Sequence, residues 1–153
     1  MILDKKIEEI KIGEKELELI NLKTAELINK LEKVIKKKRI KAEVFLGGSL
    51  AKKTLIKKSM YDIDLFVRFS SDENISDILE KILKLAGLKA ERIHGSRDYF
   101  RVNGRIMFEI VPVLRINKPE QAKNVTDLSY FHVSYITKKI RKNKKLAEEI
   151  MLA

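Results

Sequence analysis

Residues 47–67, GGSLAKKTLIKKSMYDIDLFV, decide the fold of this chain. Near the end of the stretch, Asp62 and Asp64 stand one residue apart in an otherwise apolar run. Residues i and i+2 of a β-strand point to the same face, so the two carboxylates project together, roughly 6.5–7 Å apart. The apolar residues that alternate with them point to the opposite face, toward the core. Two desolvated carboxylates are costly unless they are paired, and a divalent cation removes that cost.

A third acid stands in a later apolar run, IMFEIVPV, residues 106–113. Glu109 lies on the face opposite Phe108 and Ile110, and it comes alongside the aspartates if this strand adjoins theirs. Taken singly, Glu109 is more simply interpreted as an edge-strand acid facing solvent. The alternative for the two aspartates is the solvated face of an edge strand. Taken together, the three acids favour a two-metal site for phosphoryl or nucleotidyl transfer.

The glycines and serine at the start of the stretch predict a phosphate-binding turn. Gly47 and Gly48 follow a short strand, and glycines let backbone N–H groups approach a phosphate closely. We expect a helix to start at Ser49, with its positive dipole end aimed at the phosphate and the hydroxyl adding a hydrogen bond. Lys52 and Lys53 come one turn further on. The alternative is an ordinary turn with a serine N-cap.

Composition narrows the class of protein. The chain has 153 residues, which suits one domain, and its net charge of +11 favours nucleotide or nucleic-acid partners. No apolar run approaches the ~20 residues that cross a bilayer. The basic helices have no Trp and few aromatic residues, so a peripheral membrane role ranks low. The lack of cysteine excludes disulfides, and the N-terminus is not a secretory signal, so we expect a cytoplasmic protein.

The hydrophobic pattern predicts an α+β fold, a mixed β-sheet backed by helices on one face, in a single domain spanning residues 1–153. A short helical piece precedes Gly13, and a long amphipathic helix follows over residues 14–38. Helical periodicity also covers 72–87 and 128–152, with a break near Asn143. Strands are expected at 42–48, 62–69, 88–93 and in a hairpin around Asn103-Gly104, with a connector opening at Pro119.

These residues resemble a known family, the DNA polymerase beta-like nucleotidyltransferase superfamily. The shared pattern is Gly-Ser, a spacer, Asp-hydrophobic-Asp and an acid on a later strand. The chain is most similar to the catalytic head of the archaeal (class I) tRNA CCA-adding enzymes. FEIVPVLRI, residues 108–116, resembles that family's aspartate-hydrophobic-Val-Pro strand. KNVTDLSYFHVSYI, residues 123–136, resembles its Ala-Val-Asp-Arg-Thr-Pro-Phe-His stretch through Val125, Asp127, Phe131 and His132.

The resemblance implies a polymerase beta-like fold and transfer of a nucleoside monophosphate from ATP or CTP to an RNA 3′ end, tRNA foremost. It implies Mg²⁺ at a two-metal site, with Mn²⁺ as a substitute, and release of pyrophosphate. By residue-to-residue match, the catalytic metal ligands are Asp62, Asp64 and Glu109. The nucleotide-binding residues are Gly48, Ser49, Lys52 and His132. Without the match, a lone helical histidine such as His132 is more simply interpreted as structural.

The sequence departs from that family in three ways. Glu109 replaces an aspartate and is one methylene longer, and Lys52 replaces an arginine and loses bidentate phosphate geometry. The chain also ends where the family's neck, body and tail domains begin. We therefore expect a fragment, a stand-alone minimal transferase, or one subunit of a split enzyme with a missing partner.

Two other functions stay open from the sequence. One is a minimal nucleotidyltransferase that modifies a protein partner, of the toxin–antitoxin type, because such enzymes share the Gly-Ser and acidic-pair motif. The other is an inactive, basic RNA-binding module. All three acids are present, and the aromatic residues are too few for a sheet that stacks RNA bases, so both observations disfavour the module.

Overall fold

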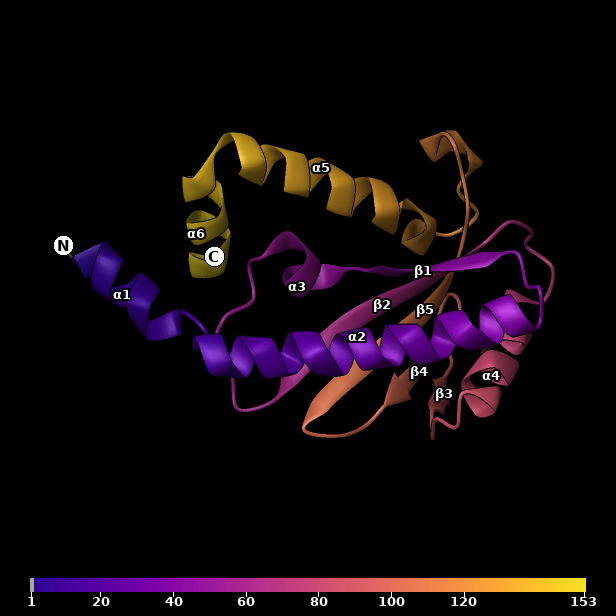
Figure 1. Cartoon of the computed structure of the whole chain (residues 1–153). Coiled ribbons are helices and arrows are strands. Elements are labelled where there is room, and N and C mark those ends of the chain that lie inside the picture. The colour runs from indigo at the N-terminus through magenta and orange to yellow at the C-terminus, as the bar shows by residue number, and fades with distance from the viewer. Residues whose placement is uncertain (1) are drawn as a thin grey trace.

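The computed structural model describes residues 2–153, apart from the side chain of Lys144. Figure 1 shows a sheet with helices packed around it. The helices are α1 (Ile2–Ile10), α2 (Glu14–Lys37), α3 (Gly48–Lys52), α4 (Ile75–Leu85), α5 (Ser129–Lys142) and α6 (Lys144–Leu152), with 3₁₀ turns η1 (Pro119–Gln121) and η2 (Val125–Leu128). The strands are β1 (Ala42–Leu46), β2 (Tyr61–Phe69), β3 (Glu91–Ile93), β4 (Tyr99–Val102) and β5 (Ile106–Leu114).

The five strands form one mixed sheet in the order β1-β2-β5-β4-β3. The central pair, β2 and β5, is parallel, and the other neighbouring pairs are antiparallel. The α+β fold with a mixed sheet is therefore confirmed. The parallel pairing matters most for the site, because it puts the strand that carries the two aspartates directly beside the strand that carries Glu109.

Alternation along β2 divides its side chains between two faces of the sheet. Ile63, Leu65 and Val67 are almost fully buried, at 1%, 0% and 0% exposure. They belong to one apolar core together with the buried stripe of α2, which includes Leu27 and Leu31, and with the buried residues of α4. A stripe of this kind is what the helical spacing of α2 predicts. The expected layer of helices on this face is confirmed.

Helix α5 lies over the opposite face of β1 and β2, so the expectation that helices back the sheet on one face alone is wrong. Tyr130, at the start of α5, makes an edge-on contact with Phe45, at a centroid distance of 5.4 Å. Phe45 is itself stacked on Phe66, its neighbour in the register of β1 and β2. Figure 1 shows α5 and α2 on opposite sides of these strands. Helix α5 thus covers the part of this face that follows Asp62 and Asp64 along β2.

Several boundaries differ slightly from the sequence-based expectations. Helix α3 begins at Gly48 with Gly47 as its N-cap, one residue before the expected start at Ser49. The β4–β5 hairpin is confirmed, but Val102 pairs with Phe108, so the loop is wider than a two-residue turn. The break near Asn143 is confirmed, since α5 ends before it and its side chain caps α6. None of the helices within residues 2–153 has both the length and the apolar character needed to span a membrane.

Candidate active site

The three acids singled out in the sequence share one face of the sheet. Asp64 and Glu109 are direct partners in the parallel register of β2 and β5, and Asp62 is two residues before Asp64 on the same face. The burial pattern along β2 confirms the alternation, with Asp62 exposed and Asp64 half-buried between fully buried neighbours. The expectation that the Glu109 strand adjoins the aspartate strand is therefore confirmed. Carboxylate oxygens on one face suit the oxygen-rich coordination that Mg²⁺ requires.

The Asp64 carboxyl is surrounded by charged side chains of both signs. Burial raises the pKa of its carboxyl, and the nearby negative charges of Glu109 and Asp62 raise it further. Lys52 and Lys58 act in the opposite direction and lower it. The pKa of Asp64 is raised on balance, so burial first, and the neighbouring acids second, disfavour negative charge at this position. A bound divalent cation is a natural way to compensate it.

The glycine turn packs directly on Asp64. The backbone N–H of Gly47 donates a hydrogen bond of 2.9 Å to the backbone carbonyl of Asp64. Gly48 has a left-handed φ of +62°, and a Cβ at this position would lie 2.2 Å from Oδ2 of Asp64. A side chain at Gly48 would therefore be strained by the backbone conformation and would clash with the carboxylate of Asp64. The turn and the acid form one unit, which links the phosphate-binding motif to the metal-binding motif.

Ser49 and Lys52 lie on α3, next to the acids. Ser49 is half-buried, and its backbone carbonyl accepts a hydrogen bond of 2.8 Å from the N–H of Thr54. Lys52, the last residue of α3, lies close enough to Asp64 to lower the pKa of that carboxyl. The structure thus brings Gly48, Ser49 and Lys52 to the edge of the acidic face. Lys58, in the loop before β2, joins them.

Arg101 is a residue of this site that sequence reasoning missed. It is the partner of Glu109 in the antiparallel register of β4 and β5, and its Nε donates to Oε1 of Glu109 over 3.3 Å. Within residues 2–153, no three carboxylate or imidazole side chains converge closely enough to chelate one ion. Arg101 lies on β4, the neighbour of β5 on the side opposite β2, so it contacts Glu109 from the side of β5 that is opposite the aspartate strand.

The structure places His132 on α5, the helix that packs against α3. It is exposed on α5. Its assignment to nucleotide binding therefore stays a prediction.

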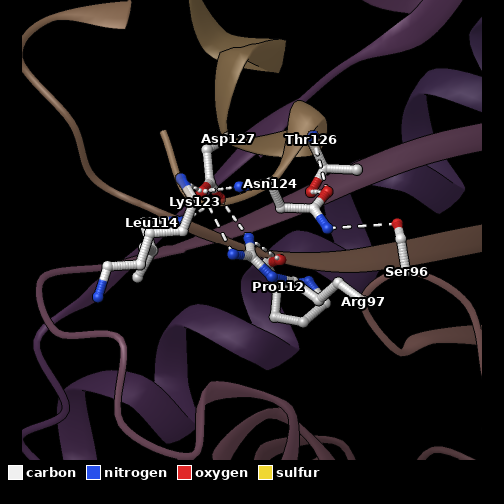
Figure 2. A network of polar contacts seen from close by, with 8 residues as sticks. All are labelled: Ser96, Arg97, Pro112, Leu114, Lys123, Asn124, Thr126 and Asp127. Atoms are coloured by element: carbon white, nitrogen blue, oxygen red, sulfur yellow. Dashed lines mark hydrogen bonds and ion pairs between the residues drawn. The ribbon is translucent and has the colours of Figure 1, made fainter. Parts of the chain in front are cut away.

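Asp127, part of the same matched stretch, has a clear structural role instead. Its buried carboxylate pairs with Arg97 and accepts backbone N–H bonds from Leu114 (2.9 Å) and Lys123 (3.0 Å). Figure 2 shows these contacts converging from the β3–β4 loop, β5 and η2. Burial opposes ionisation, but these donors together hold the pKa of Asp127 below its usual range. The network fixes the start of α5 to the sheet.

Comparison with known proteins identifies the family that this site belongs to. The family model described as "Nucleotidyltransferase domain" matches residues 28–151, which include every candidate site residue. The chain belongs to the nucleotidyltransferase domain family. The match covers β1, the glycine turn, both acidic strands and all of α5, so the family assignment rests on the same elements that build the site.

Curated relatives of this nucleotidyltransferase chain include two archaeal proteins named CCA-adding enzyme. That of Nanoarchaeum equitans is 42% identical over 103 residues, covering 65% of this chain and 26% of the relative. That of Methanocaldococcus jannaschii is 32% identical over 162 aligned positions, covering 99% of this chain and 35% of the relative. The chain thus spans about a quarter to a third of the length of these relatives.

Solved structures confirm the nucleotidyltransferase fold. A cytoplasmic RNA terminal U-transferase superposes with a TM-score of 0.71 at 18% identity, covering 99% of this chain and 42% of that one. The CdnC protein of E. coli MS115-1, solved with ATP, gives a TM-score of 0.70 at 20% identity, covering 95% of this chain and 54% of that one. At these identities the likeness concerns the fold alone.

Proposed function

We propose that this chain carries the catalytic domain of a metal-dependent nucleotidyltransferase that adds a nucleoside monophosphate to an RNA 3′ end, with tRNA as the preferred acceptor. The observation that carries the proposal is the direct register pairing of Asp64 with Glu109, with Asp62 on the same face. Membership of the nucleotidyltransferase family and the archaeal CCA-adding relatives support it.

In the proposed reaction, the RNA 3′-oxygen forms a bond to the α-phosphorus of an NTP. The bond between that phosphorus and the pyrophosphate oxygen breaks, and the hydroxyl proton leaves to solvent. Two Mg²⁺ ions would neutralise the charge on the attacking and leaving oxygens when bound. Asp62, Asp64 and Glu109 would hold them, because they supply carboxylate oxygens on one face. Glu109 must then share or leave its contact with Arg101.

The glycine turn and α3 hold the triphosphate in this proposal. Gly48 lets the backbone pass directly over Asp64, so a phosphate bound at the turn lies next to the acids. The Ser49 hydroxyl and the Lys52 ammonium supply a donor and a positive charge beside them. These residues position the NTP, while the carboxylates hold the cations that act on it.

The acceptor follows from charge and from the relatives' names. The net charge of +11 attracts a polyanion, and the two curated relatives are named for CCA addition. Those names support tRNA as the acceptor and CTP and ATP as donors. The chain spans about a quarter to a third of the length of these relatives, so we expect it alone to bind RNA weakly and with little sequence preference.

One experiment tests the proposal against its alternatives. The chain is incubated with Mg²⁺, each labelled NTP in turn, and either tRNA lacking its 3′ end or a total protein extract. The proposal predicts label on RNA that requires Mg²⁺ and disappears in Asp64→Asn. Label on protein would support transfer to a protein partner, and label on neither would support a binding module.

A further inference from the structure

On the sheet face that carries the acids, the charge of the side chains changes from negative to positive along the strands. Strand β2 presents Asp62 and Asp64 near its start and Arg68 near its end, all on the same face by alternation. Arg115 follows β5 on the same face as Glu109, six residues on, and its backbone N–H donates to Phe69 over 2.7 Å. Negative groups therefore gather at one end of this face and positive groups at the other.

A cavity of about 340 Å³ lies at the positive end. Its polar lining comes from Lys41, Glu43, Arg68, Ser70 and Arg115. Three segments that are distant in sequence supply these side chains: the start of β1, the end of β2 and the end of β5. Three cationic side chains face a single carboxylate in this cavity, so an anion entering it meets net positive charge.

Arg68 is held in place before any ligand arrives. Its side chain is only 11% exposed and pairs with Glu43 through Nε and the terminal nitrogen. Its guanidinium also lies 3.9 Å from the ring centroid of Tyr130. An arginine held by a carboxylate and an aromatic ring loses little conformational entropy on binding a phosphate oxygen.

Lys41 and Arg115 are the other two cationic side chains that line the cavity. Both are exposed. Among the ion pairs formed within residues 2–153, none involves either side chain. The one acid in the cavity, Glu43, is already engaged by Arg68. Two cations therefore remain available to an incoming anion.

We propose that this cavity binds a phosphodiester of the RNA strand whose 3′ end reaches the carboxylates. The inference rests on the proposed function for the identity of the strand. Four to six residues of β2 separate Asp64 from Arg68 and Ser70, which is roughly 13–20 Å at 3.3 Å per residue. Tyr130 of α5 covers Phe45 and Arg68 between these points, so the RNA strand must pass beside α5. Stacked as in a duplex, at 3.4 Å per phosphate, the strand needs roughly four to six nucleotides or more to cover the span. Arg68, Lys41 and Arg115 thus contact the backbone several nucleotides upstream of the reacting end.

The test measures RNA binding, not transfer. A fluorescent twelve-nucleotide RNA is titrated by anisotropy against the wild type, against Lys41→Ala/Arg115→Ala, and against the control Lys30→Ala/Lys33→Ala. The control removes the same charge from exposed positions of α2, which packs on the other face of the sheet. Each titration is repeated over a range of salt concentrations, and NTP binding is measured beside it.

We expect the Lys41→Ala/Arg115→Ala protein to bind the RNA about tenfold more weakly at low salt. We also expect the slope of log affinity against log salt to fall by roughly 1.4, because each phosphate contact to a single strand contributes roughly 0.7. NTP affinity should stay at the wild-type value, and the control should keep the wild-type slope.

Equal losses in the two double variants would overturn the proposal, because they would show an effect of net charge alone. A loss of NTP affinity in Lys41→Ala/Arg115→Ala would also overturn it, because the cavity would then hold a nucleotide. If the variants have altered melting curves, Lys41→Gln/Arg115→Gln gives the same comparison with more side-chain volume retained. This result is independent of the test of the proposed function, because RNA binding can be compared among the variants whether or not the chain transfers nucleotides.

Discussion

Asp64 and Glu109 lie directly opposite one another in the two parallel central strands of the sheet. The pairing places two acids from segments 45 residues apart in sequence on one face, beside Asp62. Burial and the two neighbouring charges raise the pKa of Asp64, so the arrangement has an electrostatic cost in the protein alone. Sites that retain such a cost are commonly functional.

Glu109→Gln should keep the fold and NTP binding but slow transfer by ~10²–10⁴-fold, as expected for loss of one catalytic group. Arg101, which donates to Glu109, should tolerate the neutral amide without unfolding the hairpin. Single-turnover kinetics with labelled NTP gives the rate, and a thermal melt checks the fold. Glu109→Asp is the companion variant, because it restores the family's usual residue with one methylene less. Full activity in Glu109→Gln would remove this residue from the mechanism.

Gly48→Ala should both destabilise the protein and abolish transfer. The new Cβ would meet the Asp64 carboxylate at 2.2 Å on a backbone with φ of +62°, so either the turn or the acid must move. We expect a loss of about 1–3 kcal/mol in the free energy of unfolding. Gly87→Ala is the matched control, because Gly87 has a φ of +75° but open space around it. The control should lose about 1 kcal/mol from backbone strain and keep its activity. Equal activity in the two variants would show that the glycine turn is not part of the active site.

Lys52→Ala should weaken NTP binding roughly threefold to tenfold, with a loss that shrinks as salt is raised. Lys52 acts on Asp64 from the last residue of α3, so its charge reaches the same space as the triphosphate. Lys57→Ala, which removes an exposed lysine from the following loop, is the control and should have little effect. Calorimetric titration with a non-hydrolysable NTP at two salt concentrations makes the comparison. Equal losses in both variants would mean that the phosphates are bound elsewhere.

Asp127→Asn should cost about 2–4 kcal/mol of stability near neutral pH, because it removes the charge that pairs with Arg97. The pKa of Asp127 is held below its usual range, so its ionised form stabilises the folded state above pH ~4, the ordinary pKa of an aspartate. That contribution is lost as the pH falls through the lowered pKa of the folded state. The difference between variant and wild type should therefore be constant from pH 5 to 8 and shrink in more acidic solution. Denaturant unfolding at several pH values measures it, and a pH-independent difference would contradict the assignment.

Much of the site could be predicted from the sequence because strands have a period of two. Alternation alone put Asp62 and Asp64 on one face, and it gave the face of Glu109 within its own strand. The pairing of these strands could only be stated as a condition, since nothing local in the sequence fixes which strands are neighbours. The family pattern indicated that the acid of a later strand joins the two aspartates, and the pairing of β2 with β5 confirms that these strands are neighbours.

Contacts between segments account for most of what sequence reasoning missed. Arg101 could be linked to Glu109 only after the register of β4 and β5 was known, because an ion pair across two strands depends on which residues the register places opposite one another. The fit of Gly48 against Asp64 depends on how α3 crosses β2, and the position of α5 depends on the buried contacts of Asp127. These are tertiary relationships, which no local pattern encodes.

Metal binding at the carboxylates tests the central claim most directly, and calorimetry with Mn²⁺ in the presence of a non-hydrolysable NTP measures it. The wild type should bind Mn²⁺, and Asp64→Asn should bind it more than tenfold more weakly, because the substitution removes charge while keeping the volume of the side chain. Glu32→Gln, an exposed acid on α2, is the control and should retain wild-type affinity. Equal Mn²⁺ affinity in the wild type and in a folded Asp64→Asn would contradict the account, because the paired acids would then not be the metal site.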